Sequence, residues 1–399
     1  MRVQLRWCNE QPCCPGKAAV EDWPPSKALA GSEESEVVMP RSNATKLVLG
    51  LWTLVCTASV GAAGTPDLKK LYKERVEAAR QRFDAVEKFE VFGWNRQQRF
   101  AYIVKPDPTR YWGRRLLEAE LALCENKPAK AKAYEAYWKR AKHYADIAEE
   151  KKKSLSGHQK LAATYVRLEA EMWFRQQEAD PDAVKSVAKA RLEAARKALG
   201  NVEALVKAGR FSSDDERFLL WPRRLLDAQL AVSTDKKGRV TALESYLKFQ
   251  KTREKIGEDR VTAGIIARVV VWQIQFDRLD AELMLKKEVE PKAIAPLARK
   301  KLEVAREVLK FLQDNVEAGR ISPFESAPWA RHVLEAQLAL EPAKHQRIEA
   351  LQDYLNQTKK IEKMISNGVD VGKYHSFQLS EARYYRVDAE ILLLQAKGK

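Results

Sequence analysis

One phrase of eleven residues occurs three times in this chain and constrains its fold more than any other feature. It reads WGRRLLEAELA from Trp112, WPRRLLDAQLA from Trp221 and WARHVLEAQLA from Trp329, at intervals of 109 and 108 residues. Self-similarity at a fixed interval is typical of tandem arrays, in which each unit packs against its neighbours. The sequence therefore predicts three units of about 110 residues, which span 64–178, 179–288 and 289–399.

Two further phrases keep nearly the same interval. The segments RLEAEMW, RLDAELM and RVDAEIL begin at Arg167, Arg278 and Arg386, and the segments RVEAAR, RLEAAR and KLEVAR begin at Arg75, Arg191 and Lys301. An apolar residue, an acid, Ala and then Glu or Gln recurs about twice in each unit. Each unit is therefore expected to hold about four antiparallel amphipathic helices, which makes six helical hairpins in all.

The spacing of apolar residues within the phrase predicts helices. Trp329, Val333, Ala336 and Leu340 fall at i, i+4, i+7 and i+11, which places them on one face of a helix. Ala, Leu, Glu, Lys and Arg dominate, and no sustained strand-type alternation occurs. We therefore expect an all-α protein, either bundle-like or solenoid-like.

The charged residues of the phrases are spaced for pairing along the helix surface. Arg114 with Glu118, Arg223 with Asp227, and Arg331 with Glu335 are i,i+4 pairs. Glu169 and Glu171 are expected to lie on the helix surface beside Arg167.

Ala-Gly-Arg segments precede two of the three phrases. Gly209 and Gly319 suit the left-handed position that ends a helix. Ser212 and Ser322 follow three residues later and are expected to cap the next helix through their side chains.

The N-terminal region predicts export. Residues 39–63 read as a signal peptide, with a basic flank, an apolar run too short to span a bilayer comfortably and small residues at a cleavage site. Residues 1–38 are expected to be an over-extended start or an unstructured extension. An uncleaved N-terminal membrane anchor is the alternative. With the signal removed, no integral membrane span is expected, and the mature chain retains Cys124 as its one cysteine.

The net charge of +16 is spread along the helices, where basic and acidic residues alternate. A charge of this sign favours an anionic partner, such as an anionic envelope surface. Because it forms no concentrated basic patch, nucleic acid is not favoured. The five histidines are scattered and match no zinc or di-iron motif, and no phosphate-binding loop or nucleophile elbow occurs. The sequence therefore predicts no enzyme, cofactor or metal site.

The first unit differs from the others between Phe92 and Trp112, where a longer segment rich in aromatic residues and Arg replaces the Ala-Gly-Arg turn. It is expected either to bind a partner through aromatic and Arg anchors or to cover the exposed end of the array. An enzymatic site hidden in this segment is a further reading. The candidate partner-binding residues, taken from this segment and from the three phrases, are Trp94, Arg96, Tyr102, Arg110, Trp112, Arg114, Trp221, Arg223, Trp329 and Arg331.

The segments Val206 to Val232 and Val316 to Leu340 resemble the helical hairpins of outer membrane efflux proteins of the TolC-like family. In both, a helix ends at an Ala-Gly turn and a helix with regularly placed Ala and Leu follows. The resemblance implies hairpin geometry, but the strands that would form a barrel wall are absent from the sequence. We expect an exported, non-catalytic helical-repeat scaffold or binding protein of the cell envelope, whose partner is another envelope protein. The alternative is a component of a TolC-like efflux assembly.

Overall fold

The computed structural model describes residues 66–90, 108–150, 157–210, 216–340 and 343–398. These residues form twelve α-helices and no strand, so the predicted all-α class is confirmed. Residues 1–38 and the predicted signal peptide at 39–63 lie outside this part of the chain. Among the described helices, none combines the length and the apolar character that a bilayer crossing requires.

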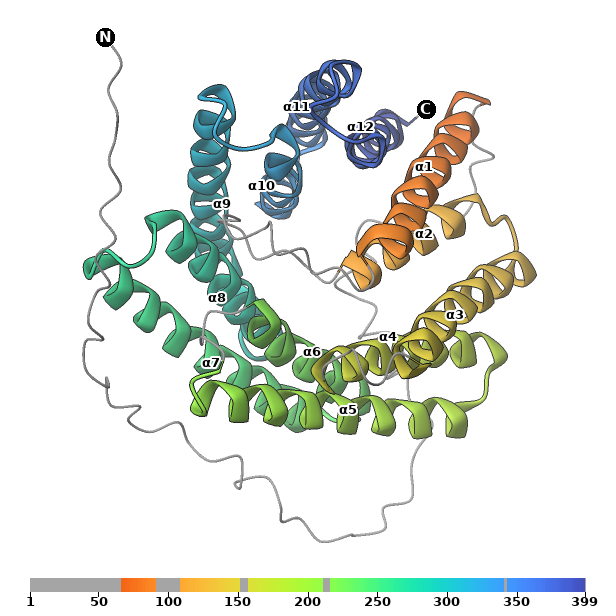
Figure 1. Cartoon of the computed structure of the whole chain (residues 1–399), viewed down its shortest axis with the longest axis vertical. Coiled ribbons are helices and arrows are strands. Elements are labelled where there is room, and N and C mark those ends of the chain that lie inside the picture. The colour runs from red at the N-terminus through yellow and green to blue at the C-terminus, as the bar shows by residue number, and fades with distance from the viewer. Residues whose placement is uncertain (1–65, 91–107, 151–156, 211–215, 341–342, 399) are drawn as a thin grey trace, which may run out of the picture. The chain divides into compact units, whose positions relative to one another are not determined.

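Figure 1 shows the helices in chain order. Their bounds are α1 Pro66–Ala85, α2 Pro108–Leu123, α3 Lys127–Glu150, α4 Gly157–Glu178, α5 Pro181–Lys207, α6 Glu216–Val232, α7 Lys236–Thr262, α8 Arg268–Val289, α9 Ile294–Glu317, α10 Ala327–Leu340, α11 Lys344–Asp370 and α12 Ser376–Lys397. A π-helical turn, η3 (Val86–Glu90), extends α1. Two 3₁₀ turns, η5 (Pro291–Ala293) and η6 (Pro323–Ser326), precede α9 and α10.

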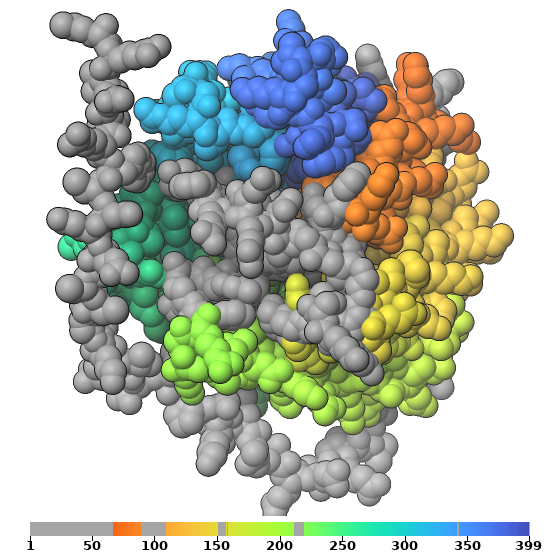
Figure 2. Space-filling model, in the orientation of Figure 1, coloured from red at the N-terminus to blue at the C-terminus, as the bar shows by residue number. Residues whose placement is uncertain are grey.

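Each helix packs against the next one along the chain, and the last packs against the first. The contacts run in order from α1 to α12, and α12 then packs along α1. Figure 2 shows the same closure, with the orange α1 beside the blue C-terminal helices. The array therefore closes on itself, whereas the sequence was compatible with both a bundle-like and a solenoid-like arrangement. The division into three units stays a prediction.

The contact that closes the array has a hydrophobic core of its own. Phe83 of α1, Trp112 of α2, Ile365 of α11 and Tyr384 of α12 are all buried and belong to one cluster. Burial of a large apolar side chain typically stabilises a protein by about 1.5 to 3 kcal/mol. The first and last helices are thus joined by apolar packing as well as by the ion pairs described below.

The predicted apolar stripe faces inward most strongly at the start of each phrase. Trp112, Trp221 and Trp329 are buried, as are Ala119, Ala228 and Ala336 seven residues later. The final residue of each stripe is only half-buried. A buried Ala keeps the helix surface low, so that a neighbouring helix can approach closely.

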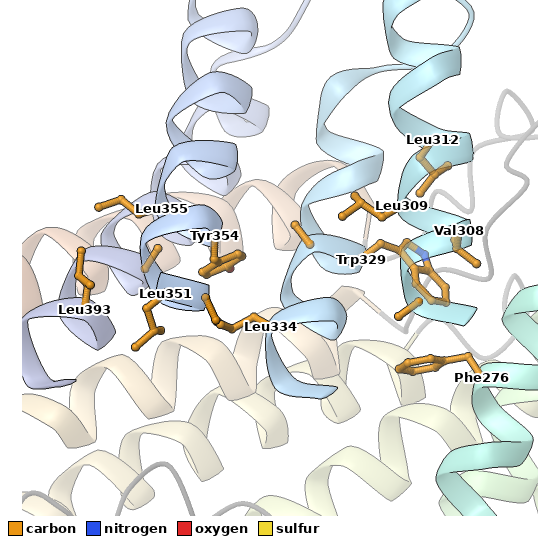
Figure 3. Close-up of a cluster of buried hydrophobic side chains, with 14 of the residues drawn as sticks. Phe276, Val308, Leu309, Leu312, Trp329, Leu334, Leu351, Tyr354, Leu355 and Leu393 are labelled. Atoms are coloured by element: carbon orange, nitrogen blue, oxygen red, sulfur yellow. The ribbon is translucent and has the colours of Figure 1, made fainter. Parts of the chain in front are cut away.

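The core around α8 to α12 illustrates how the phrase is used. Figure 3 shows Phe276 of α8 facing Trp329 of α10, and Leu334 of α10 beside Leu351 and Tyr354 of α11. The rings of Phe276 and Trp329 meet edge to face with centroids 5.1 Å apart. This arrangement is favoured by the charge distribution of aromatic rings.

The predicted glycine turns are confirmed at Gly209 and Gly319, which both adopt a φ of 67°. Gly264 after α7 and Gly372 after α11 take the same left-handed conformation. After Gly319, the Arg320 amide donates to the Asn315 carbonyl, which is the six-residue bond of a Schellman motif. The odd-numbered helices from α5 to α11 thus share one type of ending, which the sequence analysis found in only two of the four.

The predicted capping role of Ser322 is wrong. Its side chain makes no capping hydrogen bond, and its hydroxyl is buried without a partner. The backbone here forms the 3₁₀ turn η6, in which the Glu325 amide donates to the Ser322 carbonyl. The turn leaves the Ser322 hydroxyl without the geometry of an α-helical cap. Ser212 lies outside the described residues.

Gly368 permits a close approach that no other residue type would allow. A Cβ added there would lie 2.1 Å from the Tyr374 ring.

We expect Gly368→Ala to lower the free energy of unfolding by about 1 to 3 kcal/mol, because the Tyr374 ring must move. The matched control is Gly200→Ala in α5, where a Cβ meets no atom within 4 Å. That change is expected to raise stability by about 0.5 to 1 kcal/mol. Urea unfolding of both variants checks the pair, and equal effects would contradict the packing argument.

Candidate functional site

The structure places seven of the ten predicted partner-binding residues, while Trp94, Arg96 and Tyr102 lie outside its described part. Three of the seven are the tryptophans of the repeated phrase, and four are arginines. The tryptophans are buried, and the arginines are at most partly exposed. Both groups lie where helices meet.

Each tryptophan packs against an aromatic ring of another even-numbered helix. Trp112 meets Tyr384 with ring centroids 5.5 Å apart, Trp221 meets Tyr165 at 6.0 Å, and Trp329 meets Phe276 at 5.1 Å, all edge to face. These contacts join α2 to α12, α6 to α4, and α10 to α8. The tryptophans therefore connect the predicted units to one another, and the contact between the third unit and the first has the same form as the two within the chain.

The arginine two residues after each tryptophan bonds to the acid of the second phrase. Arg114 donates to Glu169 at 2.5 Å, Arg223 to Asp280 at 3.0 Å and Arg331 to Asp388 at 2.5 Å. The partners are 55, 57 and 57 residues apart. Each bond therefore joins the two hairpins of one predicted unit.

A second cation reaches the same three acids from the adjacent odd-numbered helix. Arg191 of α5 donates to Glu169 at 3.1 Å, and Lys301 of α9 donates to Asp280 at 2.6 Å. Arg75 of α1 donates to Asp388 at 2.8 Å. These three cations are the first residues of the RVEAAR, RLEAAR and KLEVAR phrases, so one cation–acid contact is repeated at all three places.

The contact at Glu169 is larger than the other two, and we name it the Glu169 cluster: Arg110, Arg114, Tyr165, Glu169, Arg191 and Asp227. The Glu169 carboxylate has no exposed surface and accepts from all three arginines. Arg110 binds it with two nitrogens, at 3.2 and 2.8 Å, and also donates to Asp227 of α6 at 3.1 Å. The residues at the position of Arg110 before the other two tryptophans are Leu219 and Ala327. The third cation is therefore particular to the first phrase.

The paired cations keep these three acids ionised. Burial alone would raise the pKa of the Glu169 carboxyl, but attraction to Arg110, Arg114 and Arg191 holds that pKa well below its ordinary value. The pKa of Asp388 is lowered against the same effect of burial by Arg331 and Arg75. Burial also opposes ionisation of Asp280, whose pKa is lowered by Lys301 and Arg223.

These pKa shifts define what the Glu169 cluster can do chemically. A carboxylate with a lowered pKa and five hydrogen bonds from guanidinium groups is a poor proton acceptor. The side chains of Arg110 and Arg114 are 15% and 21% exposed, and that of Arg223 is 40% exposed. Guanidinium groups held in this way can present nitrogens to a carboxylate or phosphate of a partner. The arrangement thus suits recognition of an anionic group.

Two expectations for the charged residues are corrected. Glu169 is not a surface residue, although Arg167 and Glu171 form the expected pair at 2.9 Å. The predicted pair of Arg114 with Glu118 is replaced by two others, because Arg114 donates to Glu169 and Glu118 accepts from Arg115. The predicted pairs of Arg223 with Asp227 and of Arg331 with Glu335 are confirmed at 3.2 and 2.9 Å.

Sequence reasoning missed Glu169, Arg191 and Tyr165 as members of the cluster. Glu169 and Arg191 nevertheless stand at fixed positions of repeated phrases, and a charged residue kept at one position of every phrase was the available signal. Within the part of the chain that the structure describes, no group of three or more His, Cys, Asp or Glu side chains is arranged to hold a metal ion.

The chain matches no protein-family model, and no curated protein matches it. The resemblance to outer membrane efflux proteins therefore stays a prediction.

The tryptophans are expected to stabilise the array. We expect Trp221→Ala to lower the free energy of unfolding by about 3 to 5 kcal/mol, because a buried indole is replaced by a cavity between α4 and α6. Leu205→Ala, at a half-buried position near the end of α5, is the control and should cost less. Chemical denaturation monitored by circular dichroism measures both. A stability loss no larger than that of the control would show that Trp221 is not a packing residue.

Acid should destabilise the array through three ion-paired carboxylates. Because the pKa values of Glu169, Asp280 and Asp388 are lowered on folding, their stabilising contribution is complete above about pH 4.5 and is lost as the pH falls through the folded pKa values. Unfolding midpoints measured from pH 7 to pH 2 should therefore fall steeply below about pH 4.5.

The variant Glu169→Gln tests which acid contributes. It should cost about 3 to 5 kcal/mol at pH 7, because Arg110, Arg114 and Arg191 lose their buried counter-charge. It should also show a shallower decline in acid than the parent. A decline as steep as that of the parent would exclude Glu169 from the acid response.

Proposed function

We propose that this chain is an exported, non-catalytic scaffold or binding protein of the cell envelope. One observation carries the proposal: the residues repeated in every phrase are used to join helices of a closed array. Trp221 packs on Tyr165, and Arg223 bonds to Asp280. The same contacts recur in each of the three phrases, so we assign the repeated residues to holding the helices together. We assign binding to features that occur once in the chain.

The Glu169 cluster is the feature that supports binding most directly. It brings Arg110, Arg114 and Arg191 together around Glu169, with Asp227 as the second carboxylate. Cations thus outnumber carboxylates in this cluster, and two guanidinium groups remain partly exposed. Charge complementarity favours a partner that presents carboxylate or phosphate groups, such as an anionic envelope protein or surface.

The location rests on the sequence alone. The apolar run between Leu47 and Val60, flanked by Arg41 and Lys46, supports export. An uncleaved segment would instead anchor the chain to the membrane and leave the helical array on the outer side.

The second candidate is a component of a TolC-like transport assembly, in which hairpins dock end to end with other subunits. Its support is the exposure of the Ala-Gly-Arg turns, where Arg210 and Arg320 are exposed directly after their glycines. A hairpin tip with an exposed cation can serve as a docking point for an acidic tip of another subunit.

Fractionation of the native host, combined with crosslinking, separates the two candidates. A photo-crosslinking residue replaces Arg210 or Arg320 at a turn, and another replaces Leu220 of α6, which directly precedes Trp221. Recovery in a soluble envelope fraction, with crosslinks from position 220 to an envelope protein, supports the scaffold. Recovery in the outer membrane, with crosslinks from positions 210 and 320 to an inner-membrane pump, supports the transport assembly and overturns the scaffold proposal. Chain retained in the cytoplasm would contradict both.

A further inference from the structure

The contact between α1 and α12 joins the two ends of the described chain. Arg75 bonds to Asp388 at 2.8 Å, and Arg82 bonds to Glu381 at 3.0 Å. The Ser380 hydroxyl donates to the Gln81 side chain at 2.9 Å. The side chains of both ion pairs are about nine-tenths buried. We call this contact the closing interface.

The closing interface repeats contacts made elsewhere between neighbouring helices. Arg75 meets Asp388 as Arg191 meets Glu169 between α5 and α4, and as Lys301 meets Asp280 between α9 and α8. The internal partners are 22 and 21 residues apart, whereas Arg75 and Asp388 are 313 residues apart. The internal contacts are therefore tethered by short connections, while the closing one is held by non-covalent contacts across nearly the whole chain.

The two sides of the closing interface are different surfaces. Arg75 and Arg82 of α1 meet the α12 carboxylates Asp388 and Glu381. A third ion pair has the opposite polarity, since Glu74 of α1 meets Arg386 of α12. The charges along α1 therefore match those along α12. The α1 surface of one copy can therefore pack against the α12 surface of another copy.

We propose that the closing interface is also an intermolecular interface, whose partner is a second copy of this chain. Two open copies exchange ends, so that α1 of each packs on α12 of the other and both interfaces keep their native contacts. Opening exposes apolar side chains and charges that were nearly buried, so an open copy has a strong preference for re-pairing. Closure within one chain prevails in dilute solution, and exchange grows with protein concentration.

Charge reversal on one side at a time tests this proposal with full-length chains. Arg82→Glu places two carboxylates in the closing interface, and Glu381→Arg places two guanidinium groups there. In an exchanged pair formed by one chain of each kind, one interface pairs the two substituted side chains, whose charges are again opposite, and the other interface is native. Each variant alone is therefore mismatched, and only the mixed pair is matched at both interfaces.

The two variants are unfolded, mixed and refolded together, and native mass spectrometry records the species. We expect a mixed dimer that is absent when either variant is refolded alone, and whose share rises with concentration. The double variant Arg82→Glu with Glu381→Arg is expected to refold as a closed monomer in dilute solution, since its own interface is matched.

Charge reversal at a tethered contact is the control. Lys301→Glu and Asp280→Lys are mismatched within one chain, and mixing the two variants is not expected to produce a dimer, because α8 and α9 are joined by a short connection. Mixed dimers from this pair at the same level would show that dimerisation does not depend on the closing interface.

A second measurement applies where charge reversal prevents folding. Two differently tagged copies of the natural chain are refolded together over a wide concentration range. Recovery of chains carrying both tags at high concentration supports the proposal. Monomer alone at every concentration, in both experiments, overturns it.

Discussion

The fold depends on three buried or partly buried carboxylates that are each held by cations from two different helices. Removing a carboxylate from water costs several kcal/mol, and this cost is offset only when opposite charges and hydrogen-bond donors surround it. Glu169, Asp280 and Asp388 each accept from the arginine two residues after a repeated tryptophan and from a cation of the adjacent odd-numbered helix. Glu169 also accepts from Arg110. A shift of one helix along its neighbour would leave such an acid unpaired, so these contacts fix the register of the array.

The apolar contacts follow the same plan. Each tryptophan of the repeated phrase lies edge to face on an aromatic ring of a neighbouring even-numbered helix. Apolar packing supplies most of the stability, because it scales with buried area, while the ion pairs determine which surfaces fit together. The same kind of ion pair joins α12 to α1, so α1 packs on the surface of α12.

Features that occur once stand out against this repeated frame. Arg110 is present before the first tryptophan and not before the others, and it links Glu169 of α4 to Asp227 of α6. It lies in the first turn of α2, within the Phe92 to Trp112 segment that differs from the other two units. The frame and the particular features thus support different roles. The frame holds the helices in place, and the Glu169 cluster adds guanidinium groups that suit an anionic partner.

Local features of the fold could be predicted from the sequence, because they depend on residues close together in the chain. The helical periodicity around Trp329, the left-handed turns at Gly209 and Gly319, and the pair of Arg331 with Glu335 all involve separations within a few turns. Arg114, Arg223 and Arg331 were also found by their repetition, and Arg110 was found by its place in the Phe92 to Trp112 segment. Their partners were not, because Arg114 binds an acid 55 residues away and Arg110 binds one 117 residues away. The sequence by itself determined the helices, their turns and their inward faces. Only the tertiary structure decided that Glu169 is buried and that α1 closes on α12, because those outcomes depend on how surfaces from distant parts of the chain fit together.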